Sequence, residues 1–467
     1  MKQILRGLSE IRGYFFRDET PTWYICATPY TLLGMDEWVR GFRFVSYADC
    51  FDGRHPRVFV PPQDIDETFP YELLEDMNND LLRRADVQAH IRRFGPGRAL
   101  FMMFDDTTRA LAADLDLDLI LPEAHLRRMV DDKVEATRIG DRAGVPSVPN
   151  ALGRAGSWSE LQALAKGLGP DLVVQTPFGD SGTTTFFVSS ESEFDRYAGA
   201  IVAEPEIKVM KRIRPVQAAI EGCVTRQGTI VGPLMTEVIG FDELTPFRGG
   251  WAGNEATTGA FTDAQRQAAS KGTARFGDAL RALGYRGYFE IDWLIDQDTD
   301  EVYLGEVNPR LSGASPLTNL AAFAHADAPL FLFHLLEYSG VEFELDVDRM
   351  NTRWRDPDNL DDWSQLILKR TEDSTVRLTG APQSGVWRLE HDGSATFLFP
   401  QTHRRTVDGE DQAFFLRIPR VGDRVNFADD LGILVFRGRT MTEDGGLTDR
   451  ANAWVNAIRR HFEGEPV

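Results

Sequence analysis

A chain of 467 residues is too long for one ordinary hydrophobic core, so we expect two or three domains. Hydrophobic residues make up 42% of the chain and charged residues 26%, a globular composition that excludes disorder as the main state. The formal net charge of −21 would repel the backbone of DNA or RNA, so nucleic acid is not an expected partner.

The cysteines and the apolar segments indicate the compartment. Cys26, Cys50 and Cys223 are scattered and lack a CxxC spacing, so we expect neither structural disulfides nor a thiolate zinc site. The first residues lack the apolar region of a secretory signal, and no run approaches the roughly 18 apolar residues of a membrane span. We therefore expect no membrane association and a cytoplasmic location.

The first part of the chain has the pattern of an α/β domain. A helix is expected at 105–115, and short apolar segments predict strands at 23–28, 58–60, 99–104 and 119–121. Short buried strands that alternate with helices indicate a parallel sheet with helices on its faces.

The middle of the chain is expected to be more varied. A helix is predicted at 131–143, where Asp131 or Asp132 can cap its start and Gly144 can end it in a left-handed conformation. A Gly-, Ser- and Thr-rich turn at 177–185 joins two predicted strands. Further along we expect a Gly-rich loop at 244–255, a long helix at 263–283, an apolar helix at 316–338 and a strand-rich region at 366–440.

The most informative pattern is a pair of strands at 288–295 and 302–308. Side chains alternate between the faces of a strand, so the pairs Glu290 and Asp292, and Glu306 and Asn308, each share one face. A five-residue turn then places Asp292 opposite Glu306 and Glu290 opposite Asn308. Nearer the turn, the same register pairs position 294 with 304 and position 296 with 302.

Two carboxylates that face each other across neighbouring strands repel, and a divalent cation removes this conflict. Carboxylate and amide oxygens suit Mg²⁺, so we predict that Asp292, Glu306 and Asn308 bind Mg²⁺, with Mn²⁺ as an alternative ion. A polar strand that faces solvent is the alternative interpretation.

Two arginines are candidates for catalysis. Arg310 follows the predicted metal cluster, and its planar guanidinium suits a transferring phosphate or a substrate carboxylate. Arg248 lies in the Gly-rich loop and is a candidate for binding a substrate carboxylate or an acyl phosphate. The alternative for both is a surface arginine without a catalytic role.

The order of Asp292, a turn, Glu306, Asn308 and Arg310 resembles the metal site of the ATP-grasp superfamily. The helix at 131–143 resembles the segment that leads into the grasp in that family, and its phosphate-binding lysine corresponds to Lys133.

The family's other nucleotide-binding parts follow in the same order. The loop at 178–185 resembles the lid over the phosphates, which implies that Ser181, Gly182, Thr183 and Thr184 contact ATP. The strand at 209–213 resembles the hinge whose backbone contacts adenine, which implies roles for Lys211 and Ile213. Lys208 and Lys211 are expected on opposite faces of this strand, so only one of them can reach the nucleotide.

The resemblance implies an α/β (α+β) fold in three parts. These are an N-terminal, Rossmann-like pre-ATP-grasp domain at 1–122, a two-lobed ATP-grasp domain at 123–345 and a C-terminal β-rich domain at 346–467. The small lid lobe is expected at about 147–207 and the large lobe at 208–345. Within the superfamily, the chain looks most similar to carboxylate–amine ligases and biotin carboxylase-like proteins.

The resemblance further implies an ATP- and Mg²⁺-dependent ligase that joins a carboxylate, such as an amino acid or small peptide, to an amine through an acyl phosphate and releases ADP and phosphate. A bicarbonate-dependent, biotin carboxylase-like enzyme is one alternative. A non-catalytic nucleotide-binding protein is another, because Gln175 and Met210 replace residues that usually bind the nucleotide. Gln175 remains a candidate ATP ligand that can donate a hydrogen bond but carries no charge. The sequence leaves the oligomeric state open, with a homodimer as one candidate.

Overall fold

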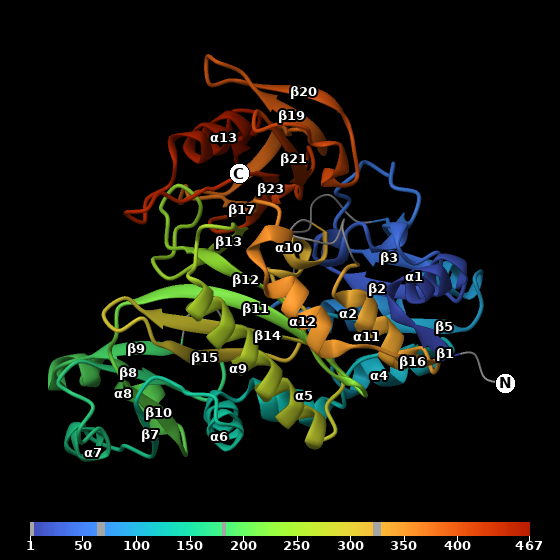
Figure 1. The fold of residues 1–467 in the computed structure, drawn as a ribbon. Coiled ribbons are helices and arrows are strands. Elements are labelled where there is room, and N and C mark those ends of the chain that lie inside the picture. Colours follow the sequence, from blue (N-terminus) through green and yellow to red (C-terminus); the bar gives the residue numbers. More distant parts are fainter. Residues whose placement is uncertain (1–3, 63–70, 180–183, 321–327) are drawn as a thin grey trace.

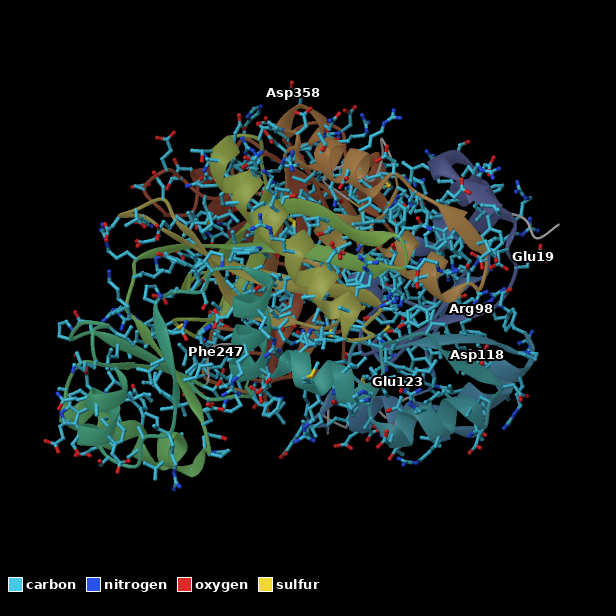
Figure 2. All side chains as sticks on the ribbon, turned by 60° about the horizontal axis from the view of Figure 1, so that its bottom comes forward. Glu19, Arg98, Asp118, Glu123, Phe247 and Asp358 are labelled. Atoms are coloured by element: carbon cyan, nitrogen blue, oxygen red, sulfur yellow. The ribbon has the colours of Figure 1, made fainter. Side chains whose placement is uncertain are left out.

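The structure is a computed structural model that describes residues 4–62, 71–179, 184–320 and 328–467. It contains a parallel sheet near the N-terminus, a small antiparallel sheet at one side and a long antiparallel sheet that runs through the middle of the molecule (Figure 1). The acidic side chains of Glu19, Asp118 and Asp358 lie exposed at the periphery, as the negative net charge suggests (Figure 2).

The N-terminal sheet buries side chains on both of its faces. Trp23 and Ile25 pack on one face, and Tyr24 and Cys26 pack on the other, which explains why this strand is apolar throughout. The strands are parallel, as predicted, in the spatial order β4 (Val58–Phe59), β3 (Phe42–Ser46), β2 (Thr22–Cys26), β5 (Gly97–Leu100) and β6 (Leu117–Leu119).

Helices cover this sheet on its two faces. Ile11 and Phe15 of the first helix join the core on the face of Tyr24, whereas the other helices join the core on the face of Trp23. These helices are α1 (Gly7–Arg17), α2 (Leu74–Arg83), α3 (Ala85–Arg92) and α4 (Asp106–Ala113). The carboxylate of Asp105 accepts a backbone N–H at 2.7 Å and caps α4, so this helix starts where the sequence predicts.

The small antiparallel sheet, which we name the lid sheet, lies beside the rest of the molecule (Figure 1). Its strands, in spatial order, are β7 (Asn150–Gly153), β10 (Ile207–Lys211), β8 (Leu172–Gln175) and β9 (Thr185–Val188). Its helices are α7 (Trp158–Leu164) and α8 (Glu191–Ala203), and the helices before it are α5 (Ala124–Asp131) and α6 (Lys133–Ala143).

The central sheet has ten strands within the described residues and includes the predicted hairpin at one edge. Its spatial order is β15 (Val302–Asn308), β14 (Gly287–Asp296), β11 (Pro215–Thr225), β12 (Gly228–Ile239), β13 (Trp251–Ala256), β17 (Trp363–Lys369), β23 (Asp430–Arg437), β21 (Gln412–Arg417), β19 (Gly385–Leu389) and β20 (Ala395–Pro400). Because β13 pairs with β17, the strand-rich C-terminal part continues the same sheet.

The remaining elements surround the central sheet. The helices are α9 (Asp263–Ala282), α10 (Ser315–Leu320), α11 (Phe331–Tyr338), α12 (Val347–Arg355) and α13 (Asp449–Arg459), and the 3-10 helices are η1 (Pro29–Leu32), η2 (Met35–Glu37), η3 (Pro357–Asn359) and η4 (Arg404–Thr406). Two small sheets consist of β1 (Ile4–Arg6) with β16 (Glu342–Glu344), and of β22 (Arg424–Val425), β18 (Val376–Gly380) and β24 (Glu463–Pro466).

Two predicted elements are wrong. The expected loop at 244–255 contains β13, because pairing on both sides with β12 and β17 outweighs the low strand propensity of its glycine and asparagine. Gly253 is required there: its φ is 145°, and a Cβ atom would lie 2.0 Å from the carbonyl oxygen of Gln365. The expected single helix at 316–338 is interrupted, since residues 328–330 are not helical and Pro329 lacks an N–H group.

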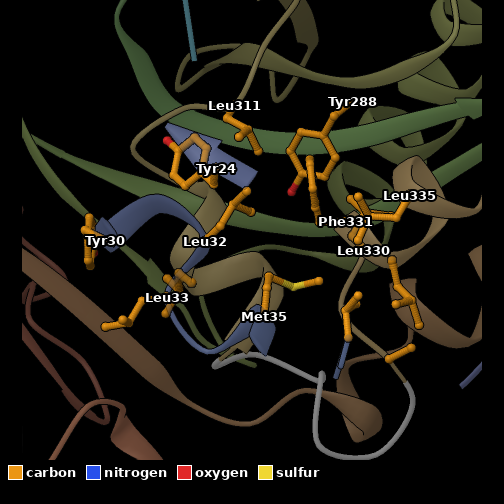
Figure 3. Close-up of a cluster of buried hydrophobic side chains, with 14 of the residues drawn as sticks. Tyr24, Tyr30, Leu32, Leu33, Met35, Tyr288, Leu311, Leu330, Phe331 and Leu335 are labelled. Atoms are coloured by element: carbon orange, nitrogen blue, oxygen red, sulfur yellow. The ribbon is translucent and has the colours of Figure 1, made fainter. Parts of the chain in front are cut away.

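One hydrophobic core joins the N-terminal sheet to the central sheet. Tyr24 and Met35 from the N-terminal part belong to the same buried cluster as Tyr288 of β14 and Phe331 of α11 (Figure 3). Removing this apolar surface from water stabilises the contact between the two parts. It therefore fixes the hairpin that carries the candidate site against the N-terminal sheet.

Candidate functional site

The hairpin of β14 and β15 brings the predicted metal-binding residues together. Asp292 lies opposite Glu306, and Glu290 lies opposite Asn308, as the sequence predicts. The side-chain amide of Asn308 donates to Glu290 Oε2 at 3.3 Å and to Asp292 Oδ2 at 3.4 Å. The oxygen atoms of both strands therefore meet on one face of the hairpin.

The register nearer the turn differs from the prediction. Ile295, and not Asp296, pairs with Val302. A β-bulge takes up the difference, because Gly305 is an extra residue between the two regions of regular pairing. The pairing of residues 290–292 with residues 306–308 is as predicted, so the facing of the acidic residues is unchanged.

Negative charge is concentrated on this face. Burial raises the pKa of Asp292 well above its usual value, and the charges of Glu290 and Glu306 raise it further. Burial and neighbouring carboxylates raise the pKa of Glu290 in the same way. Glu237 of β12, which the sequence analysis missed, belongs to this acidic cluster, because burial and the charges of Asp292 and Glu306 raise its pKa. Its signal in the sequence was only an isolated acidic residue in an apolar strand.

The donor set suits a divalent cation of the Mg²⁺ type. Asp292, Glu306 and Asn308 offer carboxylate and amide oxygens, and Mg²⁺ commonly combines one or two carboxylates with phosphate oxygens and waters. Within the described residues, no group of three or more His, Cys, Asp or Glu side chains is arranged to hold a metal ion by itself. The metal role of the three residues stays a prediction, and phosphate oxygens would have to complete the site.

Lys133 joins the acidic cluster from the start of α6. The carboxylate of Asp132 accepts two backbone N–H groups of the first turn, and the left-handed Gly144 ends the helix, so both caps are as predicted. The ammonium of Lys133 lies 3.0 Å from Glu306 Oε1 and donates to the carbonyl oxygen of Gly179 at 2.7 Å. Its side chain is only 3% exposed, which distinguishes it from an ordinary solvated helix lysine.

The hinge strand β10 presents its two lysines to different surroundings, as predicted. Lys211 is exposed, whereas Lys208 is fully buried and donates to the carbonyl oxygen of Gly305 at 3.4 Å. Burial lowers the pKa of Lys208 to about 8, and the charge of Glu306 opposes this effect. Lys208, rather than Lys211, is therefore the lysine of this strand that faces the hairpin.

The other predicted nucleotide contacts are distributed around the lid sheet. Gln175 is buried on β8, and its amide donates to the hydroxyl of Thr185 at 3.2 Å. Thr184 is half-buried just before β9, and Ile213 is half-buried just after β10. Met210, which replaces the expected acidic hinge residue, is buried within β10. The predicted contacts Ser181, Gly182 and Thr183 lie outside the described residues.

The two candidate arginines differ in their surroundings. Burial and neighbouring carboxylates raise the pKa values of Glu290 and Asp292, and the positive charge of Arg310 offsets a small part of this rise, so Arg310 lies within electrostatic range of the acidic cluster. Arg248 is exposed in the segment between β12 and β13. Of the two, the structure brings Arg310 to the cluster, and the role of Arg248 stays a prediction.

Comparison with known proteins shows which proteins this chain resembles. The family described as "Carbamoyl-phosphate synthase L chain, ATP binding domain" matches residues 132–323. Methylcrotonoyl-CoA carboxylase subunit alpha, mitochondrial, of Arabidopsis thaliana is 26% identical over 264 residues, which cover 54% of this chain and 34% of the relative. The chain therefore spans about a third of the length of the curated relative that it matches.

Solved structures show the same fold. The biotin carboxylase domain of Hydrogenobacter thermophilus 2-oxoglutarate carboxylase, solved with MgADP and bicarbonate, has a TM-score of 0.61 and 13% identity, over 96% of this chain and 91% of that chain. Phosphoribosylamine–glycine ligase of Thermotoga maritima has a TM-score of 0.59 and 11% identity, over 95% of this chain and 97% of that chain. The chain therefore has an ATP-grasp fold with biotin carboxylase-like architecture, and both the predicted fold class and the predicted resemblance are confirmed. No helix within the described residues is long and apolar enough to cross a membrane.

Proposed function

We propose that this protein is an ADP-forming ligase that uses ATP and Mg²⁺ to join a carboxylate to an amine. The observation that carries the proposal is the facing pair of Asp292 and Glu306, with Asn308 beside them and Lys133 at 3.0 Å from Glu306. Like charges in such a pair are unfavourable unless a cation lies between them. The ATP-grasp fold supports a nucleotide as the source of the remaining ligands.

The residues of the site have separate roles in this proposal. Asp292, Glu306 and Asn308 hold Mg²⁺, which supplies positive charge to the ATP phosphates and to the oxygens that gain charge during transfer. The ammonium of Lys133 binds a phosphate oxygen of ATP, and its contact with Glu306 changes to make this possible. Arg310 stabilises the transferring phosphoryl group and the acyl phosphate that forms on the substrate carboxylate. The amine then attacks the acyl carbon and releases phosphate.

An assay of ADP release tests the proposal. Purified protein with ATP and Mg²⁺ is screened with pairs of amino acids or small carboxylates and amines, and ADP release should require both members of a pair. Glu306→Gln should abolish turnover, whereas Glu301→Gln, an exposed residue of the same hairpin, should retain it. ADP release that depends on neither substrate, or full turnover in both variants, would refute the proposal.

A second candidate function is ATP-dependent carboxylation with bicarbonate. The observation that favours it is the length of the structural match, since the biotin carboxylase domain of H. thermophilus aligns with 96% of this chain and the match therefore includes the C-terminal strands of the central sheet. Bicarbonate-dependent ADP release with a biotin acceptor, and without an added amine, would favour this function over the first. A non-catalytic nucleotide-binding role would instead give binding of a non-hydrolysable ATP analogue without turnover of any substrate pair.

Several finer statements belong to the same proposal. We place the domains at 1–122, 123–345 and 346–467. Strand β10 pairs within the lid sheet and crosses the proposed boundary between the two lobes at 207 and 208. The pairing of β13 with β17 joins the second domain to the third in one sheet. A homodimer in the cytoplasm is the proposed state, supported by the dimer described for the H. thermophilus domain. Sedimentation equilibrium and cell fractionation would test these two points.

A further inference from the structure

Two buried ammonium groups approach the hairpin from different elements. Lys133 comes from the first turn of α6 and contacts Glu306 at 3.0 Å. Lys208 comes from β10 and contacts the carbonyl oxygen of Gly305, the residue before Glu306. The charges of Glu306 and Lys133 both act on Lys208, so the two ammonium groups and the carboxylate form one cluster.

Lys208 lies directly beside Gln175, the position on the strand before the lid where members of the ATP-grasp superfamily usually carry a second phosphate-binding lysine. Gln175 of β8 and Lys208 of β10 are paired residues in the antiparallel lid sheet. The side chains of such a pair project from the same face of the sheet, with Cβ atoms about 4.5–5.5 Å apart. A lysine on β10 can therefore reach nearly the same space as a lysine on β8 at position 175.

The polar groups of this pair are poorly satisfied by other groups of the protein. Gln175 is 8% exposed, and its Oε1 atom has no hydrogen-bond partner within the described residues. Lys208 is 0% exposed, and the hydrogen bond from its ammonium to Gly305 is long, at 3.4 Å. Burying a charged group is expensive unless it is paired, and an unpaired buried acceptor is also unfavourable. An anionic ligand between the lid sheet and the hairpin would pair with the ammonium of Lys208 and so remove the cost of burying its charge.

We infer that Lys208 supplies, from the neighbouring strand, the phosphate-binding cation that Gln175 lacks, and that Lys208 and Lys133 together bind the polyphosphate of the nucleotide. This inference rests on the proposed function, because it takes the ligand to be a nucleoside di- or triphosphate. It also explains how an anion binds to a chain with a net charge of −21, since local buried cations act more strongly than distant surface charges.

Calorimetric titration of the full chain tests this inference. The ligands are MgADP and adenosine, and the variants are Lys208→Met, Lys208→Met with Gln175→Lys, and the control Lys166→Met, an exposed lysine of the same lobe. Lys208→Met should weaken MgADP binding at least tenfold and leave adenosine binding within twofold of wild type. Gln175→Lys should restore most of the lost MgADP affinity, because it returns a cation to the same face. Lys166→Met should bind both ligands as wild type does.

The outcomes separate this inference from the function on which it rests. Wild-type protein that binds no MgADP overturns the proposed function. If Lys208→Met binds MgADP as tightly as the wild type does, the inference about Lys208 is overturned and the proposed function is not. Equal losses of MgADP and adenosine binding in Lys208→Met also overturn it, because they indicate a purely structural lysine between the lid sheet and the hairpin. Loss of MgADP binding without restoration by Gln175→Lys refutes the shared position of the two side chains.

Discussion

Replacing Asp292 with asparagine should have opposite effects on stability and on function. The change removes one negative charge and keeps nearly the same shape, so the contact with the amide of Asn308 can persist through the remaining carbonyl oxygen. In the ligand-free protein, burial and the charges of Glu290 and Glu306 disfavour the ionised carboxylate. We therefore expect Asp292→Asn to stabilise the ligand-free protein while it abolishes metal-dependent turnover.

The magnitude follows from the geometry of the hairpin. Opposed residues of a ladder have Cβ atoms about 5 Å apart, and two unit charges at about that separation interact with about 3 kcal/mol at an effective dielectric constant of about 20. Nearby Lys133 and Arg310 favour the charged form and offset part of this repulsion. We expect a net stabilisation of about 1–2 kcal/mol, which for a chain of 467 residues corresponds to an increase of roughly 1–2 °C in the Tm of the protein in EDTA.

Thermal unfolding with and without ligand measures both effects. Wild-type protein in EDTA is compared with protein saturated with MgADP, which should add about 2.7 kcal/mol of stability at a ligand concentration of about 100 Kd. Asp292→Asn should raise the Tm in EDTA and lose most of the increase that MgADP produces. A lower Tm in EDTA would show that Asp292 is not repelled by its neighbours. An unchanged response to MgADP would show that Asp292 is not a metal ligand.

Glu306→Gln provides the contrast within the same cluster. It removes the carboxylate that pairs with Lys133 at 3.0 Å, and the side chain of Lys133 is 3% exposed. Loss of one partner of a fully buried ion pair destabilises by about 3–5 kcal/mol. The side chain of Glu306 is 27% exposed, so water compensates part of the charge left on Lys133 and we expect a smaller loss of about 2 kcal/mol. The two variants should therefore both lack turnover while their Tm values in EDTA change in opposite directions.

Two further predictions concern the framework around the site. The buried His334 accepts the backbone N–H of Tyr288 at 3.1 Å, and burial lowers its pKa to about 4 from 6.5, so the stability that it supports is full above pH 6.5 and is lost as the pH falls from 6.5 towards 4. The full loss is about 3 kcal/mol, and about 2 kcal/mol of it falls between pH 7 and pH 5. Urea unfolding at these two pH values should show this difference in the wild type and not in His334→Gln; an equal loss in the variant would contradict this explanation. Gly272→Ala should destabilise by about 1–3 kcal/mol, because its Cβ would lie 2.4 Å from the ring of Trp293, whereas Gly199→Ala, with open space around it, should stabilise by about 0.5–1 kcal/mol. Urea midpoints that change in the same direction for both glycine variants would refute the steric reasoning.

Patterns along the sequence were sufficient wherever local rules determine the structure. The alternation of side chains in β14 and β15 predicted the facing of Asp292 and Glu306, because the two-residue period of a strand is fixed by backbone geometry. The caps of α6 were predicted for a similar reason, since Asp132 and Gly144 satisfy backbone groups within a few residues.

Patterns were insufficient wherever partners far apart in the chain compete with local preference. The Gly- and Asn-containing segment at β13 is a strand only because β12 and β17 bind it on both sides. The bulge at Gly305 changed the register near the turn, and nothing in the local sequence indicated which residue would be extra.

The sequence alone therefore determined the parallel N-terminal sheet, the acidic hairpin and the kind of ion that this hairpin suits. Only the tertiary structure decided which cations reach the hairpin. Local patterns do not distinguish Lys133 and Lys208 from ordinary surface lysines, and only the family resemblance singled out Lys133; the folded chain buries both beside the hairpin strand that carries Glu306. Burial depends on the packing of α6, β10 and β15 together, which are separated by many residues along the chain. No local pattern can encode it, because burial is a property of the assembled surfaces and not of any one segment.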